Sequence, residues 1–115
     1  LKAHQFRPDW SFNSSISQPH QVIIDYLNQL QVDFIINDRQ QIKPYELDIW
    51  IPTKRKAIEI DGTYWHSLPK AQVNDELKNQ MCKSNNIDLK RFTDVDIFNN
   101  RSQVLNQINY WINNE

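Results

Sequence analysis

Apolar residues along this 115-residue chain follow helical spacing in some segments and form short strand-like runs in others. The first helical segment follows Ser17, the expected N-cap, and has Pro19 in its first turn. Spacings of three and four residues place its apolar side chains on one helix face. These side chains are Val22, Ile23, Tyr26, Leu27 and Leu30.

Short apolar runs predict four strands, over residues 34–37, 47–51, 57–60 and 87–92. The polar stretch NDRQQIKP is expected to form the turn between the first two strands, because it is rich in turn-forming residues. The stretch PTKRK is expected to turn the second strand back as a hairpin. Gly62, the single glycine of the chain, is expected to end the third strand.

Two further helices are predicted in the second half of the chain. Val73, Leu77 and Met81 are spaced four residues apart and predict an amphipathic helix that ends near residue 84. Ser102 is the expected cap of a final helix. The buried side of that final helix is expected to carry Val104, Leu105, Ile108, Trp111 and Ile112.

The predicted order of elements is α-β-β-β-α-β-α. A hairpin followed by a strand–helix–strand crossover predicts an α/β (α+β) fold with a mixed sheet of about four strands flanked by helices. Residues 1–16 lack a clear period and are expected to form an irregular lead-in arm. We therefore expect residues 1–115 to form a single domain.

Composition excludes several classes of protein. The chain is 39% hydrophobic and 23% charged, which is typical of a folded domain rather than a disordered one. No run approaches the roughly 20 apolar residues needed to cross a bilayer, and no signal peptide is recognisable, so a soluble cytoplasmic protein is expected. The single cysteine, Cys82, excludes an internal disulfide and a Cys-rich zinc site, and we expect it in the core.

Carboxylates occur on the two predicted hairpin strands, at Glu46 and Asp48 and at Glu59 and Asp61. Because side chains alternate along a strand, each pair shares a face, and pairing of the strands brings Asp48 near Glu59. Converging carboxylates repel each other unless a cation neutralises them, and oxygen ligands favour Mg²⁺. The alternative is that these acids form the solvated face of a hairpin. Similarly, His66 is either a packed loop histidine or a proton-transfer residue near the acids.

The segments ELDIWIP, KAIEIDGTYWHS and DELKNQMCKSNNIDLKRFTD together resemble the PD-(D/E)XK nuclease superfamily. The similarity is to the very-short-patch-repair (Vsr)-like endonucleases and the related catalytic domains of phage homing endonucleases. It covers residues 17 to 112. Each motif is short, and the joint order and spacing carry the resemblance. It implies a restriction-endonuclease-like fold and Mg²⁺-dependent (or Mn²⁺-dependent) hydrolysis of phosphodiester bonds in DNA.

The resemblance also implies roles for individual residues. Asp48 matches the first strand acid, a metal ligand, and Glu59 falls at the second acid. Asp61, a further metal-ligand candidate, stands where most members have lysine and repair-type members have histidine. His66 matches a histidine that assists near the scissile phosphate. Without the motif lysine, Asp61 or His66 is expected to orient or deprotonate the attacking water.

Two departures from the family pattern bear on activity. The first helix of the family carries a glutamate near its start, where this chain offers His20 or Gln21. The structural zinc of the repair enzymes has no counterpart, because one cysteine cannot hold it. Mismatch recognition is therefore not carried over to this chain.

Contacts with DNA are expected from basic and aromatic side chains near the motifs. The candidates are Lys54, Arg55, Lys56, Trp65 and Lys78. The basic residues at the hairpin tip have a solvated turn as their alternative, and Trp65 has ordinary packing. For Lys78 the alternative is a solvated helix lysine that pairs with Asp75.

A net charge of −1 gives no general signal of nucleic-acid binding. A separate DNA-recognition domain outside this chain is therefore expected, and the start at Leu1 suggests a C-terminal piece of a longer protein of bacterial or bacteriophage origin. Cutting both strands of double-stranded DNA requires two sites, so a homodimer or a nicking enzyme is implied. The alternatives are a nuclease fold that has lost catalysis and serves as a binding module, and a metal-binding protein unrelated to DNA.

Overall fold

The computed structural model describes residues 17–114, without the side chains of Trp65 and His66. The predicted arm over residues 1–16 lies outside this part. The strands are β1 (Ile35–Ile42), β2 (Tyr45–Ile51), β3 (Lys56–Asp61) and β4 (Asp88–Thr93), and a 3-10 turn, η2 (Pro52–Lys54), joins β2 to β3. The helices are α1 (Gln18–Gln29), α2 (Thr63–His66), α3 (Pro69–Ser84), α4 (Asp94–Asn99) and α5 (Arg101–Asn113).

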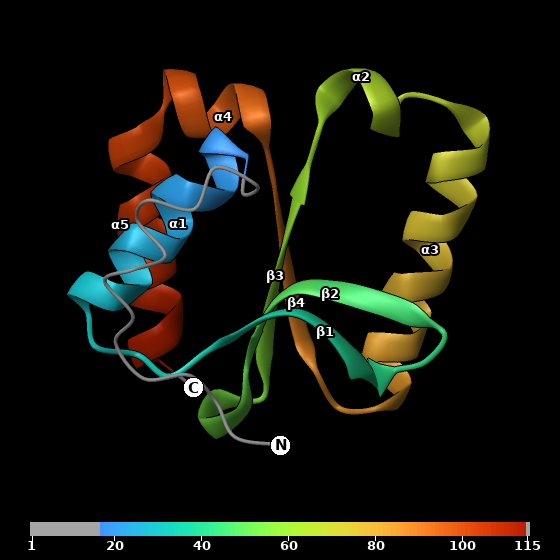
Figure 1. Ribbon diagram of the computed structural model, residues 1–115, viewed down its shortest axis with the longest axis horizontal. Coiled ribbons are helices and arrows are strands. Elements are labelled where there is room, and N and C mark those ends of the chain that lie inside the picture. Colours follow the sequence, from blue (N-terminus) through green and yellow to red (C-terminus); the bar gives the residue numbers. More distant parts are fainter. Residues whose placement is uncertain (1–16, 115) are drawn as a thin grey trace.

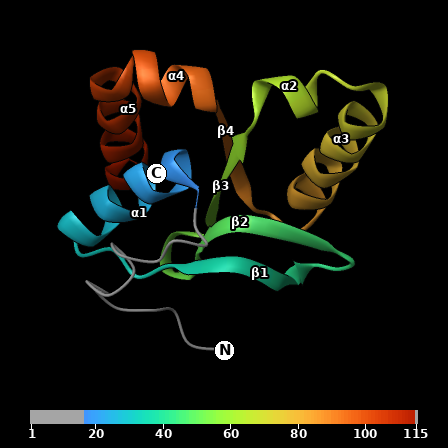
Figure 2. The ribbon, with the colours of Figure 1, turned by 45° about the horizontal axis from the view of Figure 1, so that its top comes forward.

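The four strands form one mixed sheet in the order β1-β2-β3-β4. The β1–β2 and β2–β3 pairs are antiparallel, and β3 and β4 are parallel because α3 crosses over between them. Figures 1 and 2 show α1, α4 and α5 on one side of the sheet and α2 and α3 on the other. This arrangement confirms the predicted fold class and element order, with two additional short helices.

Each side of the sheet has its own core. The larger cluster joins α1, α4 and α5 to the sheet and contains Ile58 and Ile60 of β3. The smaller cluster lies toward α3 and contains Trp50, Ala57 and Cys82, which confirms Cys82 as a core residue. Because β3 is covered on both faces, a carboxylate on its α3 side is shielded from solvent. No helix in residues 17–114 has the length and apolar character of a membrane span.

The prediction of a turn over NDRQQIKP is wrong, because most of this stretch continues β1. Asn37 takes a left-handed conformation with φ 53°, which asparagine tolerates better than most residues. The Asp38 carboxylate accepts hydrogen bonds from the backbone N–H groups of Gln40 and Gln41. These turn-forming residues therefore make an irregularity inside the strand, and the chain reverses later, at the cis peptide bond before Pro44.

The apolar face predicted for the helix over residues 73–84 is mostly exposed, and of its three residues Met81 alone packs against the smaller cluster. Val73 is 61% exposed and Leu77 is 39% exposed, whereas Cys82 is 1% exposed. α3 instead turns Lys78 toward the sheet. The apolar spacing indicated a helix correctly but not its buried face, because Lys78 on the inner face of α3 pairs with the buried Glu59 carboxylate of β3.

This orientation predicts that Val73→Ser changes the free energy of unfolding by no more than about 0.5 kcal/mol, as is usual for exposed sites. The matched change at a fully buried aliphatic residue, Ile58→Ala on β3, is expected to cost about 2–5 kcal/mol. Urea unfolding followed by circular dichroism measures both values. A loss of several kcal/mol in Val73→Ser would contradict the assigned face of α3.

The chain between β4 and the last helix forms α4, which the sequence analysis did not predict. The Thr93 side chain caps this helix by accepting a hydrogen bond from the Asp96 N–H at 3.0 Å. α5 begins at Arg101 after Asn100, so Ser102 is not its cap. The predicted buried side of α5 is confirmed at Val104, Ile108, Trp111 and Ile112, while Leu105 is partly buried.

Candidate active site

Asp48 and Glu59 lie opposite each other where β2 and β3 stop pairing through their backbones. The last backbone pair next to them is Ile49 with Ile58. Beyond it, the Asp48 N–H donates to Glu59 Oε2 at 2.7 Å, and the Ile60 N–H donates to Asp48 Oδ2 at 2.8 Å. Each carboxylate therefore accepts a hydrogen bond that a strand carbonyl would otherwise accept. The structure brings these two predicted residues together.

Burial distinguishes these acids from an ordinary polar strand face. Glu59 is 2% exposed, so the interpretation as a solvated hairpin face is wrong for this residue. It fits Glu46, whose partly exposed carboxylate pairs with the exposed Arg39 at 2.8 Å. Strict alternation also fails around Asp48, because Leu47 packs in the smaller cluster and Ile49 in the larger one.

Two side chains from helices complete the surroundings of the acid pair. Lys78 Nζ on α3 lies 2.6 Å from Glu59 Oε1, with side-chain exposures of 18% and 3%. His20 Nε2 on α1 lies 3.5 Å from Asp48 Oδ2, while its Nδ1 lies 2.5 Å from Ser17 Oγ. The alternative of a solvated Lys78 paired with Asp75 is therefore wrong.

The first helix presents one of its two candidate residues to the acids. His20 reaches Asp48, whereas the Gln21 amide donates along α1 to Asp25 Oδ1 at 2.8 Å. The backbone of His66 belongs to α2, which directly follows β3. Its side chain lies outside the described part, so its predicted role stays a prediction, as does that of Trp65.

The two carboxyl groups have pKa values displaced in opposite directions. Burial and the neighbouring charge of Asp48 raise the pKa of Glu59 above its ordinary value, against the opposing effect of Lys78. Burial also acts to raise the pKa of Asp48, but hydrogen bonds from His20 and the Ile60 N–H and the nearby positive charges bring it below its ordinary value. Glu59 is thus the member of the pair that takes up a proton first as the pH falls.

The raised pKa of Glu59 predicts how folding stability depends on pH. Above about pH 4.3, the ordinary value for glutamate, the folded state binds more protons at Glu59 than the unfolded state does. The contribution of Glu59 to stability therefore decreases as the pH rises toward the folded pKa. Glu59→Gln has no carboxylate at this position and does not show this loss. Between pH 4 and pH 8, the free energy of unfolding of the variant is therefore expected to rise relative to that of the native chain.

Urea titrations of both chains in EDTA measure this difference at each pH. Glu46→Gln, a change at a more exposed carboxylate on the neighbouring strand, is the control and is expected to keep a constant difference. A constant difference for Glu59→Gln as well would show that its pKa is not raised.

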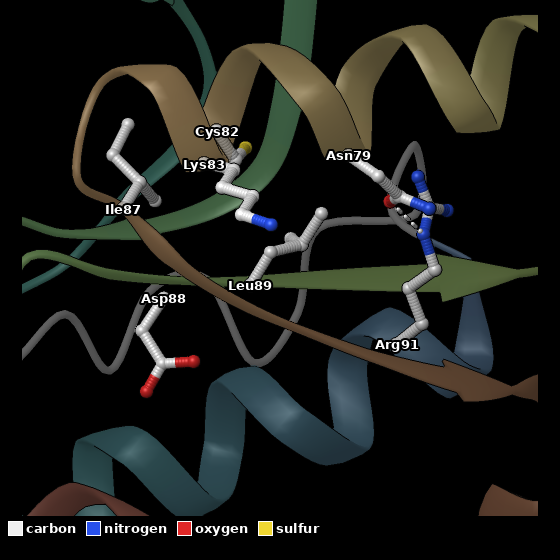
Figure 3. A pocket seen from close by; sticks show the side chains of 7 residues that line it. All are labelled: Asn79, Cys82, Lys83, Ile87, Asp88, Leu89 and Arg91. Atoms are coloured by element: carbon white, nitrogen blue, oxygen red, sulfur yellow. Dashed lines mark hydrogen bonds between the residues drawn. The ribbon is translucent and has the colours of Figure 1, made fainter.

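Asp61 does not join the other two acids but is held by Arg91. Arg91 Nη1 donates to both carboxylate oxygens of Asp61, at 3.0 and 3.2 Å. The same guanidinium donates through Nε to Asn79 Oδ1 at 2.9 Å and through Nη2 to the Asp75 backbone carbonyl at 3.2 Å. Figure 3 shows Arg91 extending from β4 to Asn79 on α3, at one end of a pocket of about 400 Å³. Arg91 was not among the predicted site residues, because nothing in the local sequence pattern marks its long-range partners.

The acid pair offers carboxylate oxygens to a divalent cation, but the described residues form no larger acidic cluster around it. Among the side chains that the structure describes, which do not include that of His66, no group of three or more His, Cys, Asp or Glu is placed to hold a metal ion. Mg²⁺ is usually held by only one or two carboxylates together with waters and substrate phosphates. The oxygens of Asp48 and Glu59, on adjacent strands and partly shielded from water, have this chemistry.

The predicted basic tip of the hairpin lies at the beginning of β3, away from the acids at its other end. Lys56 is 6% exposed and makes a 3.4 Å ion pair with Asp88. Its ammonium also lies 5.3 Å from the centre of the Trp111 ring. A lysine buried in this way contributes to packing between β3 and α5, and its position does not favour contact with a DNA backbone.

Arg55 is exposed but takes part in the turn. Its left-handed conformation, with φ 51°, follows η2, and its guanidinium donates to the backbone carbonyls of Asn85 and Asn86 at 2.6 and 3.3 Å. The guanidinium also lies 5.6 Å from the Trp50 ring. Lys54 is half-buried, and it also interacts with other groups of the protein. The basic side chains of the hairpin tip are therefore engaged in contacts within the fold and do not form a free basic loop.

Asp94 connects the beginnings of α2 and α4 on the C-terminal side of the sheet. Its Oδ1 accepts hydrogen bonds from the Thr63 N–H at 3.1 Å and from the Thr63 hydroxyl at 2.7 Å. These bonds lower the pKa of Asp94 below its ordinary value. Asp94 is the last residue of the segment DELKNQMCKSNNIDLKRFTD, but no role was predicted for it. The link fixes the segment that carries His66 relative to β4.

Comparison with known proteins supports the architecture. No family model and no curated protein sequence matches the chain. Among solved structures, the chain is similar to the homing endonuclease I-Bth0305I catalytic domain, with a TM-score of 0.68 and 21% sequence identity. The alignment covers 85% of this chain and 97% of that chain. At this level of identity the similarity establishes a shared fold.

Proposed function

We propose that this chain is the catalytic domain of a metal-dependent DNA endonuclease that hydrolyses phosphodiester bonds. The observation that carries the proposal is the partly buried acid pair, in which Asp48 and Glu59 accept hydrogen bonds from the opposing strands and have Lys78 and His20 beside them. A fold shared with a homing endonuclease catalytic domain adds support. PD-(D/E)XK chemistry and a Vsr-like relationship belong to the same proposal.

Asp48 and Glu59 are the proposed ligands for Mg²⁺ or Mn²⁺. A bound ion would neutralise charge on the phosphate and lower the pKa of a water molecule. His20 orients the Asp48 carboxylate from the position where the family has a glutamate. The Arg91 pair makes Asp61 a poor candidate for metal ligation or proton transfer. His66 remains the candidate for orienting the attacking water.

Double-stranded DNA is the proposed substrate, and a separate recognition domain is proposed to supply most of the affinity. The net charge of −1 and the engagement of Arg55 and Lys56 in the fold both support this division of labour. One acid pair cuts one strand, so the domain either nicks DNA or works as a homodimer. A bacterial or phage enzyme acting in the cytoplasm fits this proposal.

Nicking of supercoiled plasmid tests the proposal directly. The purified chain is incubated with plasmid in Mg²⁺, in Mn²⁺ and in EDTA, at high concentration because the proposed recognition domain would supply most of the affinity. We expect conversion to the open-circular form with either metal and none in EDTA, and the activity should co-elute with the chain in size-exclusion chromatography. If a folded chain cuts the plasmid with neither metal, the proposed endonuclease activity is wrong.

The second candidate function is a non-catalytic DNA-binding or interaction module with a nuclease fold. It is favoured by the way protein cations already satisfy the acids, Lys78 on Glu59 and Arg91 on Asp61. Electrophoretic mobility shifts with linear duplex DNA distinguish the two functions. Binding that is equal in Mg²⁺ and EDTA, without cutting, would support the module.

A further inference from the structure

Lys78 occupies the part of the acid pair that a divalent cation would need. Its ammonium lies 2.6 Å from Glu59 Oε1, while Glu59 Oε2 is used by the Asp48 N–H. Both oxygens of Glu59 are therefore engaged within the protein. A cation that binds Glu59 through Oε1 must take the place of the lysine.

The position of Lys78 is fixed from the other side by Arg91. The guanidinium of Arg91 binds the Asp75 carbonyl and the Asn79 side chain, which flank Lys78 on the same turn of α3. It is itself anchored to β3 through Asp61. The backbone of Lys78 is thus held close to the acid pair, while its flexible side chain is able to change partners.

The charges at this site explain why an internal cation is needed. Two partly buried carboxylates on adjacent strands repel each other, and Lys78 offsets this repulsion in the protein by itself. When a divalent ion with a phosphate arrives, Glu59 gains a stronger cation and the ammonium gains a phosphate oxygen as a new acceptor. Lysine binds phosphate readily as a point charge with three donors.

We infer that Lys78 is an exchangeable counter-ion and a substrate-contacting residue. It holds Glu59 Oε1 in the metal-free protein, leaves it when a divalent cation binds, and then contacts the scissile phosphate. This inference rests on the proposed function. It assigns the positive charge of the site to Lys78 on α3, because Asp61 occupies the strand position where most members of the resembling family have lysine. Arg91 acts as a positioning residue, and Asp61 is its counter-charge.

Calorimetric titration of Mn²⁺ into the full chain, without DNA, tests the exchange. Removing the competitor in Lys78→Met is expected to tighten Mn²⁺ binding at least tenfold. Lys83→Met removes the same charge from an exposed position on the same helix, and it is expected to change the affinity less than twofold. Lys78→Gln, which keeps a hydrogen-bond donor without charge, provides a second variant if Lys78→Met is poorly folded. Adding Glu59→Gln to Lys78→Met should remove the gain.

Each result separates the inference from the proposed function. Equal Mn²⁺ affinity in the native chain and both Lys78 variants would overturn the exchange while the metal-dependent nuclease stands. Absence of Mn²⁺ binding in every chain would overturn both proposals.

Single-turnover plasmid nicking at saturating Mn²⁺ tests the phosphate contact. Tighter metal binding by Lys78→Met together with at least tenfold slower nicking would support both parts of the inference. Tighter binding with unchanged nicking would overturn the contact with phosphate. A purely structural lysine would lower stability without producing this opposite pair of effects.

Discussion

Asp48→Asn is expected to lower the rate of Mg²⁺-dependent plasmid nicking by about 100-fold or more. Mutation of residues that only orient metal ligands already lowers metal affinity or activity by about 10–100-fold, and Asp48 is proposed to bind the metal itself. The amide oxygen of asparagine still accepts the Ile60 N–H, so the connection between β2 and β3 is retained. The negative charge that would bind the cation is lost. The variant therefore separates the chemistry of Asp48 from its structural role.

Initial rates over a range of Mg²⁺ concentrations provide the measurement, with circular dichroism to confirm folding. Glu46→Gln is the matched control, since it removes a carboxylate two residues away on β2 that pairs with Arg39 instead of the site. Nicking by the control should stay within about twofold of the native rate, the small effect usual for an exposed ion pair. If Asp48→Asn cuts as fast as the native chain, the acid pair is not the active site.

The fold was largely predictable because its strands and helices carry distinct local patterns. The α5 face and the β2–β3 hairpin follow from apolar spacing and turn residues in short segments. Local patterns failed where polar residues have a structural use. Asp38 and its neighbours form an irregularity within β1 instead of a turn, and α3 turns Lys78 inward because Glu59 is there to receive it.

The candidate site was predictable in part for the same reason. The proximity of Asp48 to Glu59 follows from the hairpin pairing of two adjacent strands, and the structure places them together. Lys78 and Arg91 reach the strand acids across 19 and 30 residues of sequence, respectively. Such contacts depend on how α3 docks on the sheet, which short-range spacing does not determine. The arrangement therefore had to come from the three-dimensional structure.

Arg91→Met is expected to lower the free energy of unfolding by about 1–3 kcal/mol, the usual cost of removing a hydrogen-bonding partner from a shielded polar group. The side chains of Arg91 and Asp61 are only 20% and 13% exposed, so Asp61 would lose the guanidinium while it is still largely shielded from solvent. Asn79 and the Asp75 carbonyl would also lose their donor. Urea unfolding in EDTA measures the loss.

Combining Arg91→Met with Asp61→Asn shows whether the lost stability comes from the charge of Asp61 in the absence of Arg91. The double variant is expected to recover at least half of the lost stability, because a neutral amide is much less costly to shield from water than a carboxylate. Arg39→Met, which breaks an ion pair with an arginine that is 78% exposed, should cost about 1 kcal/mol or less. Recovery in the double variant would assign Asp61 to holding α3 against β3 and β4, and that docking is what brings Lys78 to Glu59. No recovery would mean that Asp61 tolerates its charge without Arg91, which would return it to the candidates for binding the metal.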